Sequence, residues 1–264
     1  MTTATYPPPL DKLLTYGNCR NFRKWPNYVE ELGFTPEHIS DLLRMATDDE
    51  LNWADSNSLE VWAPIHAWRV LGQLRAEAAI EPLISLFHEL EDIDWTSTEM
   101  PEVFGLIGPT AIPALTAYLA DLSHEIYPRT TAADCLTEIG KMHPHVRTEC
   151  VTALTQQLGL FAENDSEFNA FLIADLVDLK AVESAPTMEC AFAADRVVPF
   201  IVGDWSEVQV SLGLKPREEV PQRKFTMEEV VDYFASKSDP EAPRGFSPSL
   251  RKNKKKTSKK KKYK

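Results

Sequence analysis

The sequence predicts an all-α protein in which pairs of amphipathic helices repeat and stack into an α-α superhelix, or solenoid. Glycine is scarce, with 10 residues in 264, while Ala, Leu and Glu are plentiful, a composition that favours helices over strands. Apolar residues recur at helical spacing. A two-helix pattern also returns at intervals of 32 to 37 residues, which is typical of a solenoid.

Residues 1–57 are expected to form an N-terminal helical cap. Two helices are predicted within it, at residues 25–32 and 36–45. Thr35 and the proline that follows it match an N-cap and first helical position. Gly33 suits the end of the preceding helix, because glycine readily adopts the left-handed conformation found there.

The repeats and a capping helix are expected in residues 58–213. In the clearest unit, one run of helically spaced apolar residues ends near Gly72 and a second begins near Pro82. The pattern predicts four units, at residues 63–89, 103–119, 131–158 and 171–192.

A glycine near the end of the first helix sets the register between these units. We match Gly108 and Gly140 with Gly72, and Val177 takes that place in the fourth unit. In this register the second unit has a short first helix. The capping helix is predicted at residues 204–212, where Asp and Glu have capping-box spacing.

The runs LGQLRAEAAIEPLISLF and IGPTAIPAL and the IGK turn resemble the short HEAT-like repeats named after phycobilisome lyases. The resemblance covers roughly residues 60–193. It implies a HEAT-like superhelix. Such repeats occur in bilin lyases, degradation adaptors and many scaffolds, so the resemblance specifies architecture more closely than activity.

Residues 214–250 are expected to form a proline-rich linker that contains one short helix. That helix is predicted at residues 227–236, since Thr226 and Glu229 have the spacing of a capping box. It would dock on the solenoid or on a partner.

The last fourteen residues, 251–264, are expected to form a disordered basic tail, with ten basic residues and no acid. Residues 1–250 then carry 18 basic and 40 acidic side chains, a balance of −22. The tail would bind a polyanion such as RNA, the ribosome or an anionic surface. The alternatives are contact with the protein's own acidic body and no role at all. Its candidate binding residues are Lys254, Lys255, Lys256, Lys259, Lys260, Lys261 and Lys262.

Trp62, His66 and Arg69 are candidate binding residues because their spacing places them on one helix face. A guanidinium beside an imidazole and an indole can receive a carboxylate or a wide π-system such as a tetrapyrrole. The alternative is that the rings pack on the preceding helices and Arg69 pairs with a loop carboxylate. The basic-aromatic segment at residues 16–28 has two interpretations as well, a partner contact or a cap across the solenoid end.

An acidic stretch at residues 88–103 is predicted to be a loop between repeats and contains no basic residue. It is either a site for a basic partner or the lysine tail, or a solvated loop. Its candidate residues are Glu89, Glu91, Asp92, Asp94, Glu99 and Glu102.

We assign no catalytic or metal-binding residues. The sequence has no hydrolase elbow, phosphate loop, dinucleotide fingerprint or zinc-protease motif. Cys135 and Cys150 fall too far along their helices from His143 and His145 to share a metal ion with them. No cofactor is expected either, and a bilin enters only if the resemblance extends to activity.

These patterns favour a non-enzymatic protein-binding scaffold or adaptor that acts in the assembly or turnover of a larger complex. One alternative is a bilin lyase or chromophore-handling protein, as the resemblance implies. Another is a nucleic-acid- or ribosome-associated module, against which the acidic body argues. With no 18-residue apolar run, no leader peptide and no paired cysteines, we expect a cytoplasmic protein with no transmembrane segment.

Overall fold

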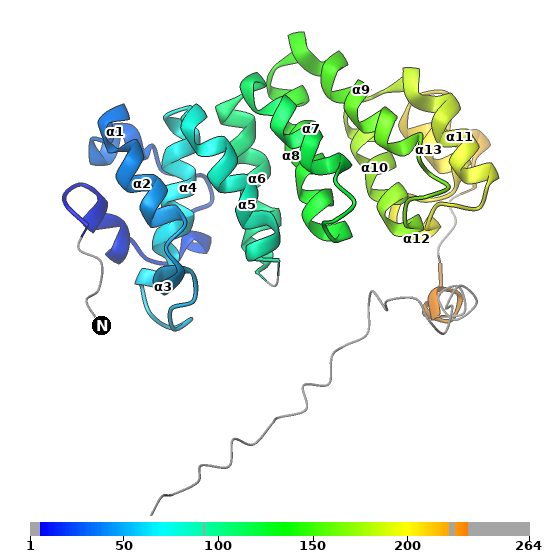
Figure 1. Cartoon of the computed structure of the whole chain (residues 1–264). Coiled ribbons are helices and arrows are strands. Elements are labelled where there is room, and N and C mark those ends of the chain that lie inside the picture. Colours follow the sequence, from blue (N-terminus) through cyan, green and yellow to red (C-terminus); the bar gives the residue numbers. More distant parts are fainter. Residues whose placement is uncertain (1–5, 92, 222–224, 232–264) are drawn as a thin grey trace, which may run out of the picture. The chain divides into compact units, whose positions relative to one another are not determined.

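A computed structural model describes residues 6–91, 93–221 and 225–231 of the chain (Figure 1). The chain divides after residue 222 into two units, which are described separately. Every regular element of the described residues is a helix, and they contain no strand. The predicted all-α class is therefore confirmed.

Short helices form the N-terminal part of the first unit. Helix α1 follows Asn27, whose side chain accepts the N–H of Glu30, and it ends at Gly33, which has a φ of +77°. The two helices predicted in this region are therefore present. The elements, with 3-10 helices labelled η, are η1 (Leu10–Thr15), η2 (Cys19–Asn21), α1 (Tyr28–Leu32), η3 (Pro36–His38), α2 (Ile39–Ala46), α3 (Asp49–Asn52) and η4 (Glu60–Trp62).

Four helix pairs follow, and each has the same internal turn, a short 3-10 helix placed directly before the second helix. The first helices are α4 (Ala63–Gln73), α6 (Asp94–Ile107), α8 (Ile126–Met142) and α10 (Ser166–Asp178). The second helices are α5 (Ile80–Glu89), α7 (Ile112–Ala120), α9 (Arg147–Leu158) and α11 (Ala185–Ala193). The turns between them are η5 (Glu77–Ala79), η6 (Pro109–Ala111), η7 (Pro144–Val146) and η8 (Val182–Ser184).

Three short elements end the first unit. They are α12 (Pro199–Val202), α13 (Trp205–Ser211) and η9 (Arg217–Glu219). The Asp204 side chain accepts the N–H of Glu207 at 3.0 Å, so α13 begins with the predicted cap.

The first helices form the central row of this unit (Figure 1). Helix α4 packs on α6, α6 on α8, and α8 on α10, whereas successive second helices contact each other much less. The row extends to the N-terminal part because α2 packs on α4. There the buried indole of Trp68 donates its N–H to the carbonyl of Ala46 at 3.1 Å.

Glycines bring neighbouring first helices into close approach. At three of these glycines, an added side chain would collide with the first helix of the next pair, or with the residue directly after that helix. A Cβ atom would lie 3.2 Å from Val103 Cα at Gly72, 2.6 Å from Met142 Sδ at Gly105 and 2.8 Å from Leu179 Cδ2 at Gly140.

The structure corrects the register of the second repeat. Gly105, and not Gly108, is the counterpart of Gly72, because Gly105 lies inside α6 at the contact with α8. Gly108 lies beyond the helix, at its C-cap, with a φ of +95°. The predicted short first helix is also wrong, since α6 has 14 residues.

The acidic stretch 88–103 was predicted to be a loop, and this too is wrong, because most of it belongs to α6. Its Ser and Thr residues and Pro101 have low helix propensity. In the structure the hydroxyls of Ser97 and Thr98 bond to the carbonyl of Asp94 at 3.0 and 2.8 Å. The hydroxyls of these side chains therefore find acceptors within the first turns of the helix. The packing of α6 on its neighbours then outweighs the low helix propensity of the stretch.

In the second unit the structure describes residues 225–231. The predicted capping box is present, because Glu229 N–H donates to Thr226 Oγ1 at 3.2 Å and Thr226 N–H donates to Glu229 Oε2 at 2.8 Å. Helical backbone runs over residues 227–231. The rest of the predicted helix, the linker after it and the lysine tail lie outside the described residues. The domain boundaries predicted from the sequence stay predictions.

No single helix of the described residues combines the length and apolar composition needed to cross a bilayer. The segments Asp94–Ile107 and Pro109–Ala120 meet these criteria only when taken together, and the chain bends by 114° between them.

The close approach at Gly72 leads to a stability prediction. The Gly72→Ala substitution is expected to destabilise the protein by about 1–2 kcal/mol, because the new methyl group meets main-chain atoms of α6 and this outweighs the gain in helix propensity. Gly105→Ala is the matched control and should cost less, since its nearest contacts are side-chain atoms, above all Met142 Sδ, and not main-chain atoms. Urea denaturation measures both, and a Gly72→Ala protein as stable as the wild type would contradict this packing.

Candidate functional site

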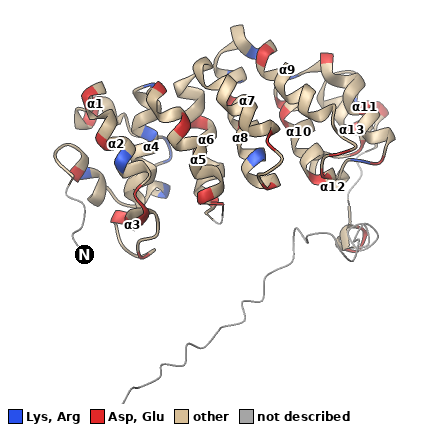
Figure 2. Ribbon diagram, in the orientation of Figure 1, with Lys and Arg blue, Asp and Glu red and all other residues tan. Residues whose placement is uncertain are grey.

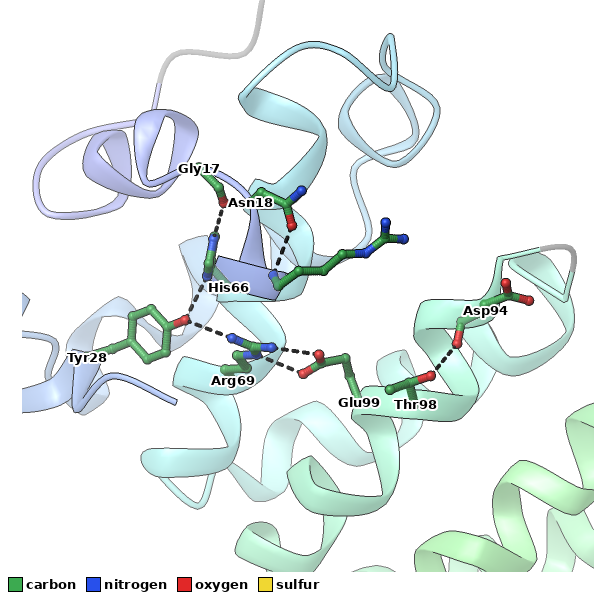
Figure 3. A network of polar contacts seen from close by, with 9 residues as sticks. Gly17, Asn18, Tyr28, His66, Arg69, Asp94, Thr98 and Glu99 are labelled. Carbon is green, nitrogen blue, oxygen red and sulfur yellow. Dashed lines mark hydrogen bonds and ion pairs between the residues drawn. The ribbon is translucent and has the colours of Figure 1, made fainter. Parts of the chain in front are cut away.

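The three residues predicted to bind a ligand lie at different depths in the structure. Trp62 is partly exposed at the end of η4. His66 and Arg69, on α4, are 0% and 3% exposed. The helical spacing of His66 and Arg69 does bring these two side chains together, but it places them in the interior of the protein (Figure 3).

His66 belongs to a directional chain of hydrogen bonds (Figure 3). Its Nε2 lies 2.8 Å from the carbonyl oxygen of Gly17, and its Nδ1 lies 2.7 Å from the hydroxyl of Tyr28. Because a carbonyl only accepts, Nε2 carries the proton, and the Tyr28 hydroxyl donates to Nδ1. Burial lowers the pKa of His66 to about 4, so the imidazole is neutral.

Arg69 forms a buried two-point ion pair with Glu99 of α6. Arg69 Nε donates to Glu99 Oε2 at 2.7 Å, and Nη2 donates to Oε1 at 2.6 Å. A third N–H reaches the Tyr28 hydroxyl at 3.5 Å, and the guanidinium lies 4.9 Å from the ring centre of Trp25. Burial lowers the pKa of Arg69, but its hydrogen bonds to Glu99 and Tyr28 raise it by more, so the side chain stays charged.

This network therefore joins three parts of the fold: the N-terminal segment, α4 and α6. The segment at residues 16–28 lies against α4, since the Tyr16 ring stacks on Phe22 and meets the edge of His66 at 5.1 Å between centroids. Glu99, predicted as part of an exposed acidic patch, is 4% exposed and holds Arg69 instead. Its prediction as a surface residue is wrong, because the stretch is helical and turns this position inward.

Trp62 has two neighbours whose contact with it was not predicted, Arg20 and Trp95. The guanidinium of Arg20 lies 4.6 Å from the ring centre of Trp95 and 5.7 Å from that of Trp62. The two indoles meet edge to face at 5.4 Å. Trp95 lies at the start of α6, in the stretch expected to be a loop, so its place beside Trp62 was not foreseen.

Several of the exposed acidic residues lie along one edge of the helix row. The described parts of the segments that join each pair to the next lie along the lower edge in Figure 2. These segments are residues 89–94, 121–125 and 159–165, and their sequences contain no Lys or Arg. We call their described, exposed carboxylates the acidic edge: Glu89, Glu91, Asp94, Asp121, Glu125, Glu163 and Asp165. Three of these residues belong to the predicted acidic patch. Of its other members, Asp92 lies outside the described residues, and Glu102 is exposed further along α6.

The acidic edge also presents apolar side chains. Leu122 is 69% exposed, Leu160 44% and Tyr127 39%. The negative charge of Glu91, on the first connecting segment, contributes to raising the pKa of Tyr127 on α8, although burial contributes most. Neighbouring connections are therefore close enough for their charges to act on each other's side chains.

Basic side chains of the repeats are mostly engaged within the fold. Residues 58–200 contain 22 acidic and only 7 basic residues. Six of the seven bases donate hydrogen bonds to carboxylates or carbonyls of the chain. They are Arg69, Arg129, Lys141, Arg147, Lys180 and Arg196.

An open groove of about 600 Å³ lies between α7 and α9. Its lining combines apolar Ile112 and Pro113 with the hydroxyls of Thr116 and Thr152. Glu149 is the one carboxylate among the lining residues, so this groove differs in character from the acidic edge.

The described residues contain no group of three or more His, Cys, Asp or Glu side chains arranged to hold a metal ion. Burial raises the pKa of Cys135 well above its usual value and that of Cys150 to about 11. Both thiols are therefore protonated at neutral pH.

No protein-family model matches the chain, and neither the search of curated proteins nor that of solved structures finds a match. The function is therefore inferred from the site.

The buried ion pair predicts a large effect of Glu99→Ala. This change leaves the Arg69 charge buried without its carboxylate and is expected to cost about 3–5 kcal/mol of folding free energy. Asp41→Ala is the control, because Asp41 pairs with Arg44 at a comparable 3.0 Å on the surface and should contribute less than about 1 kcal/mol. Urea denaturation decides, and similar losses in both variants would disprove the importance of burial at this pair.

His66 predicts a specific dependence of stability on pH. Its folded pKa is about 4, below the value near 6.5 expected when unfolded, so its contribution is present above about pH 6.5 and is lost as the pH falls toward 4. Relative to His66→Gln, the wild type is expected to lose up to about 3 kcal/mol over this range. Urea denaturation at several pH values measures the difference. A difference that does not change with pH would show that His66 takes up its proton equally in both states.

Proposed function

We propose that this chain is a non-enzymatic protein-binding scaffold, built as a HEAT-like α-α superhelix, whose acidic edge holds a basic partner. The architecture is supported by the four helix pairs with one turn design, and by the glycine contacts that recur between their first helices. Repetition of this kind places every connecting segment on the same edge of the row.

The observation that carries the proposal is the separation of charge. Six of the seven basic residues in residues 58–200 donate hydrogen bonds to other groups of the chain, while seven carboxylates of the acidic edge are exposed along it. An edge of one sign attracts a partner of the opposite sign, speeds its approach and disfavours acidic competitors.

The apolar side chains on the same edge narrow the partner's chemistry. Leu122 and Leu160 are exposed between the carboxylates and can be buried only by apolar groups. A basic segment with apolar residues at intervals would satisfy both features, since apolar burial provides affinity and charge provides selectivity.

The lysine tail adds a second contact in this proposal. Residues 251–264 would hold a polyanion such as RNA while the acidic edge holds the partner, and two tethered weak contacts give a tighter complex than either alone. This arrangement suits an adaptor in the assembly or turnover of a larger cytoplasmic complex.

The structure does not favour the two alternative functions. A bilin carboxylate would need the guanidinium of Arg69, which is buried and paired with Glu99. Nucleic acid would need a basic surface on the repeats, whose exposed charge is mainly acidic.

A labelled lysine-rich peptide tests the proposal directly. The probe is a labelled peptide of lysines with leucines at intervals, which matches the partner chemistry inferred above, and its binding to the full chain is measured by fluorescence anisotropy. The triple variant Glu89→Lys, Glu125→Lys, Glu163→Lys is expected to weaken binding at least about tenfold, because it reverses charges along the acidic edge. Binding to the wild type should also weaken as the salt concentration rises.

The matched control is Glu30→Lys, Glu37→Lys, Glu77→Lys, which makes the same change in net charge at exposed positions away from this edge. It should retain most of the binding. If both triple variants weaken binding equally, net charge alone is responsible and the acidic edge is not the site.

A further inference from the structure

The interface between α8 and α10 contains two carboxyl groups in contact. Asp134 of α8 is partly buried, and Asp175 of α10 is only 6% exposed. Their side chains lie within hydrogen-bonding reach of each other. Two ionised carboxylates in such a place would repel strongly, because little water is present to screen them.

The surroundings of this pair lack a donor for the buried oxygen. No N–H or O–H of the described residues donates to Asp175 Oδ2, although that atom is inaccessible to solvent. The hydroxyl of Thr137, one turn along α8 from Asp134, lies beside Asp175 and acts to lower its pKa, against the larger effect of burial, but it makes no hydrogen bond of normal geometry. A buried carboxylate oxygen without a donor is costly, whereas a proton between the two carboxyl groups would satisfy it.

Nearby charges do not neutralise the pair. Lys141 of α8 reaches Asp178 Oδ2 at 2.8 Å and Glu138 Oε2 at 3.7 Å, so its ammonium is shared among several carboxylates. Asp178 adds a further negative charge close to both members of the pair.

The other elements packed on α8 and α10 contribute little charge to the pair. On α6, burial raises the pKa of Glu102, and the charge of Glu138 on α8 adds to this effect. On α9, Arg147 pairs with Glu183 at 2.8 Å instead. Helix α7 has no charged residue, and neither has α12. On α5, His88 lies beside Tyr118.

We propose that Asp134 and Asp175 share one proton at neutral pH, and that this proton holds α8 against α10 as a pH-sensitive latch between the third and fourth helix pairs. Asp175 is the donor, because it is the more deeply buried, and Asp134 is the charged acceptor. Loss of the proton leaves two negative charges in the interface and weakens the contact.

The pKa values of both groups agree with this arrangement. Burial raises the pKa of Asp134 to about 6, and burial together with the charge of Asp134 raises the pKa of Asp175 well above its usual value. Both exceed the value of about 3.9 for an unfolded aspartate. The contribution of the pair to stability is therefore complete below about pH 4 and is lost as the pH rises through 6 and beyond.

Infrared spectroscopy of the full chain tests the shared proton. The wild type at pH 7 should show the carbonyl stretch of a protonated carboxylic acid. The band should be absent in Asp175→Asn and retained in Asp178→Asn, which alters an exposed neighbouring carboxylate. The wild-type spectrum is decisive even if a variant fails to fold, because absence of the band at pH 7 would overturn the proposal.

The pH dependence of the denaturation midpoint tests the latch. The wild-type midpoint is expected to fall by more than that of Asp175→Asn between pH 5 and pH 8, because the amide donates to Asp134 without needing a proton. Asp134→Asn is a second variant and should also reduce this dependence. Equal slopes in the wild type and both variants would mean that no such latch exists.

Discussion

Close packing of the first helices on one another is the constraint on which the rest of this structure depends. Gly72, Gly105 and Gly140 lie at contacts where the next helix, or the chain directly after a first helix, leaves no room for a side chain. The second helices and the turns take their places from this row. The connecting segments therefore lie along one edge, and the sequence of those segments alone decides its charge. The residues that pack the helices and the residues of the proposed binding edge thus lie in different parts of each helix pair.

Charged groups in the interior are matched by a neighbouring group, whereas the carboxylates of the acidic edge are exposed to solvent. Inside, the Arg69 guanidinium is tolerated because Glu99 binds it at two points, and the same pair joins α4 to α6. The Asp134–Asp175 pair differs from the Arg69–Glu99 pair, because no cation is dedicated to it and a shared proton reduces its negative charge instead. On the edge, carboxylates such as Glu89 and Glu125 are exposed to solvent and available to a partner. Interior charges stabilise the fold, and the edge charges are those that the proposed function uses.

The sequence predicted the parts of the fold that depend on local patterns. Helical spacing placed α4 and α5, and caps such as Asp204 and Gly33 marked the helix ends. Prediction from the sequence failed where a contact between distant segments determines the local structure. The register around Gly105, the helical start of α6 and the burial of Glu99 all depend on neighbours that no local pattern reveals. Arg69 was singled out for its chemistry, and only the structure shows that its partner lies within the chain.

Hydrogen–deuterium exchange on the full chain, with and without the lysine-rich peptide, tests most directly the proposal that the acidic edge binds a basic partner. The account predicts that added peptide slows exchange in the connecting segments at residues 89–94, 121–125 and 159–165. Exchange in the groove between α7 and α9 and in the segment at residues 16–28 should stay the same. Protection confined to that groove or that segment, or no protection anywhere, would contradict the account.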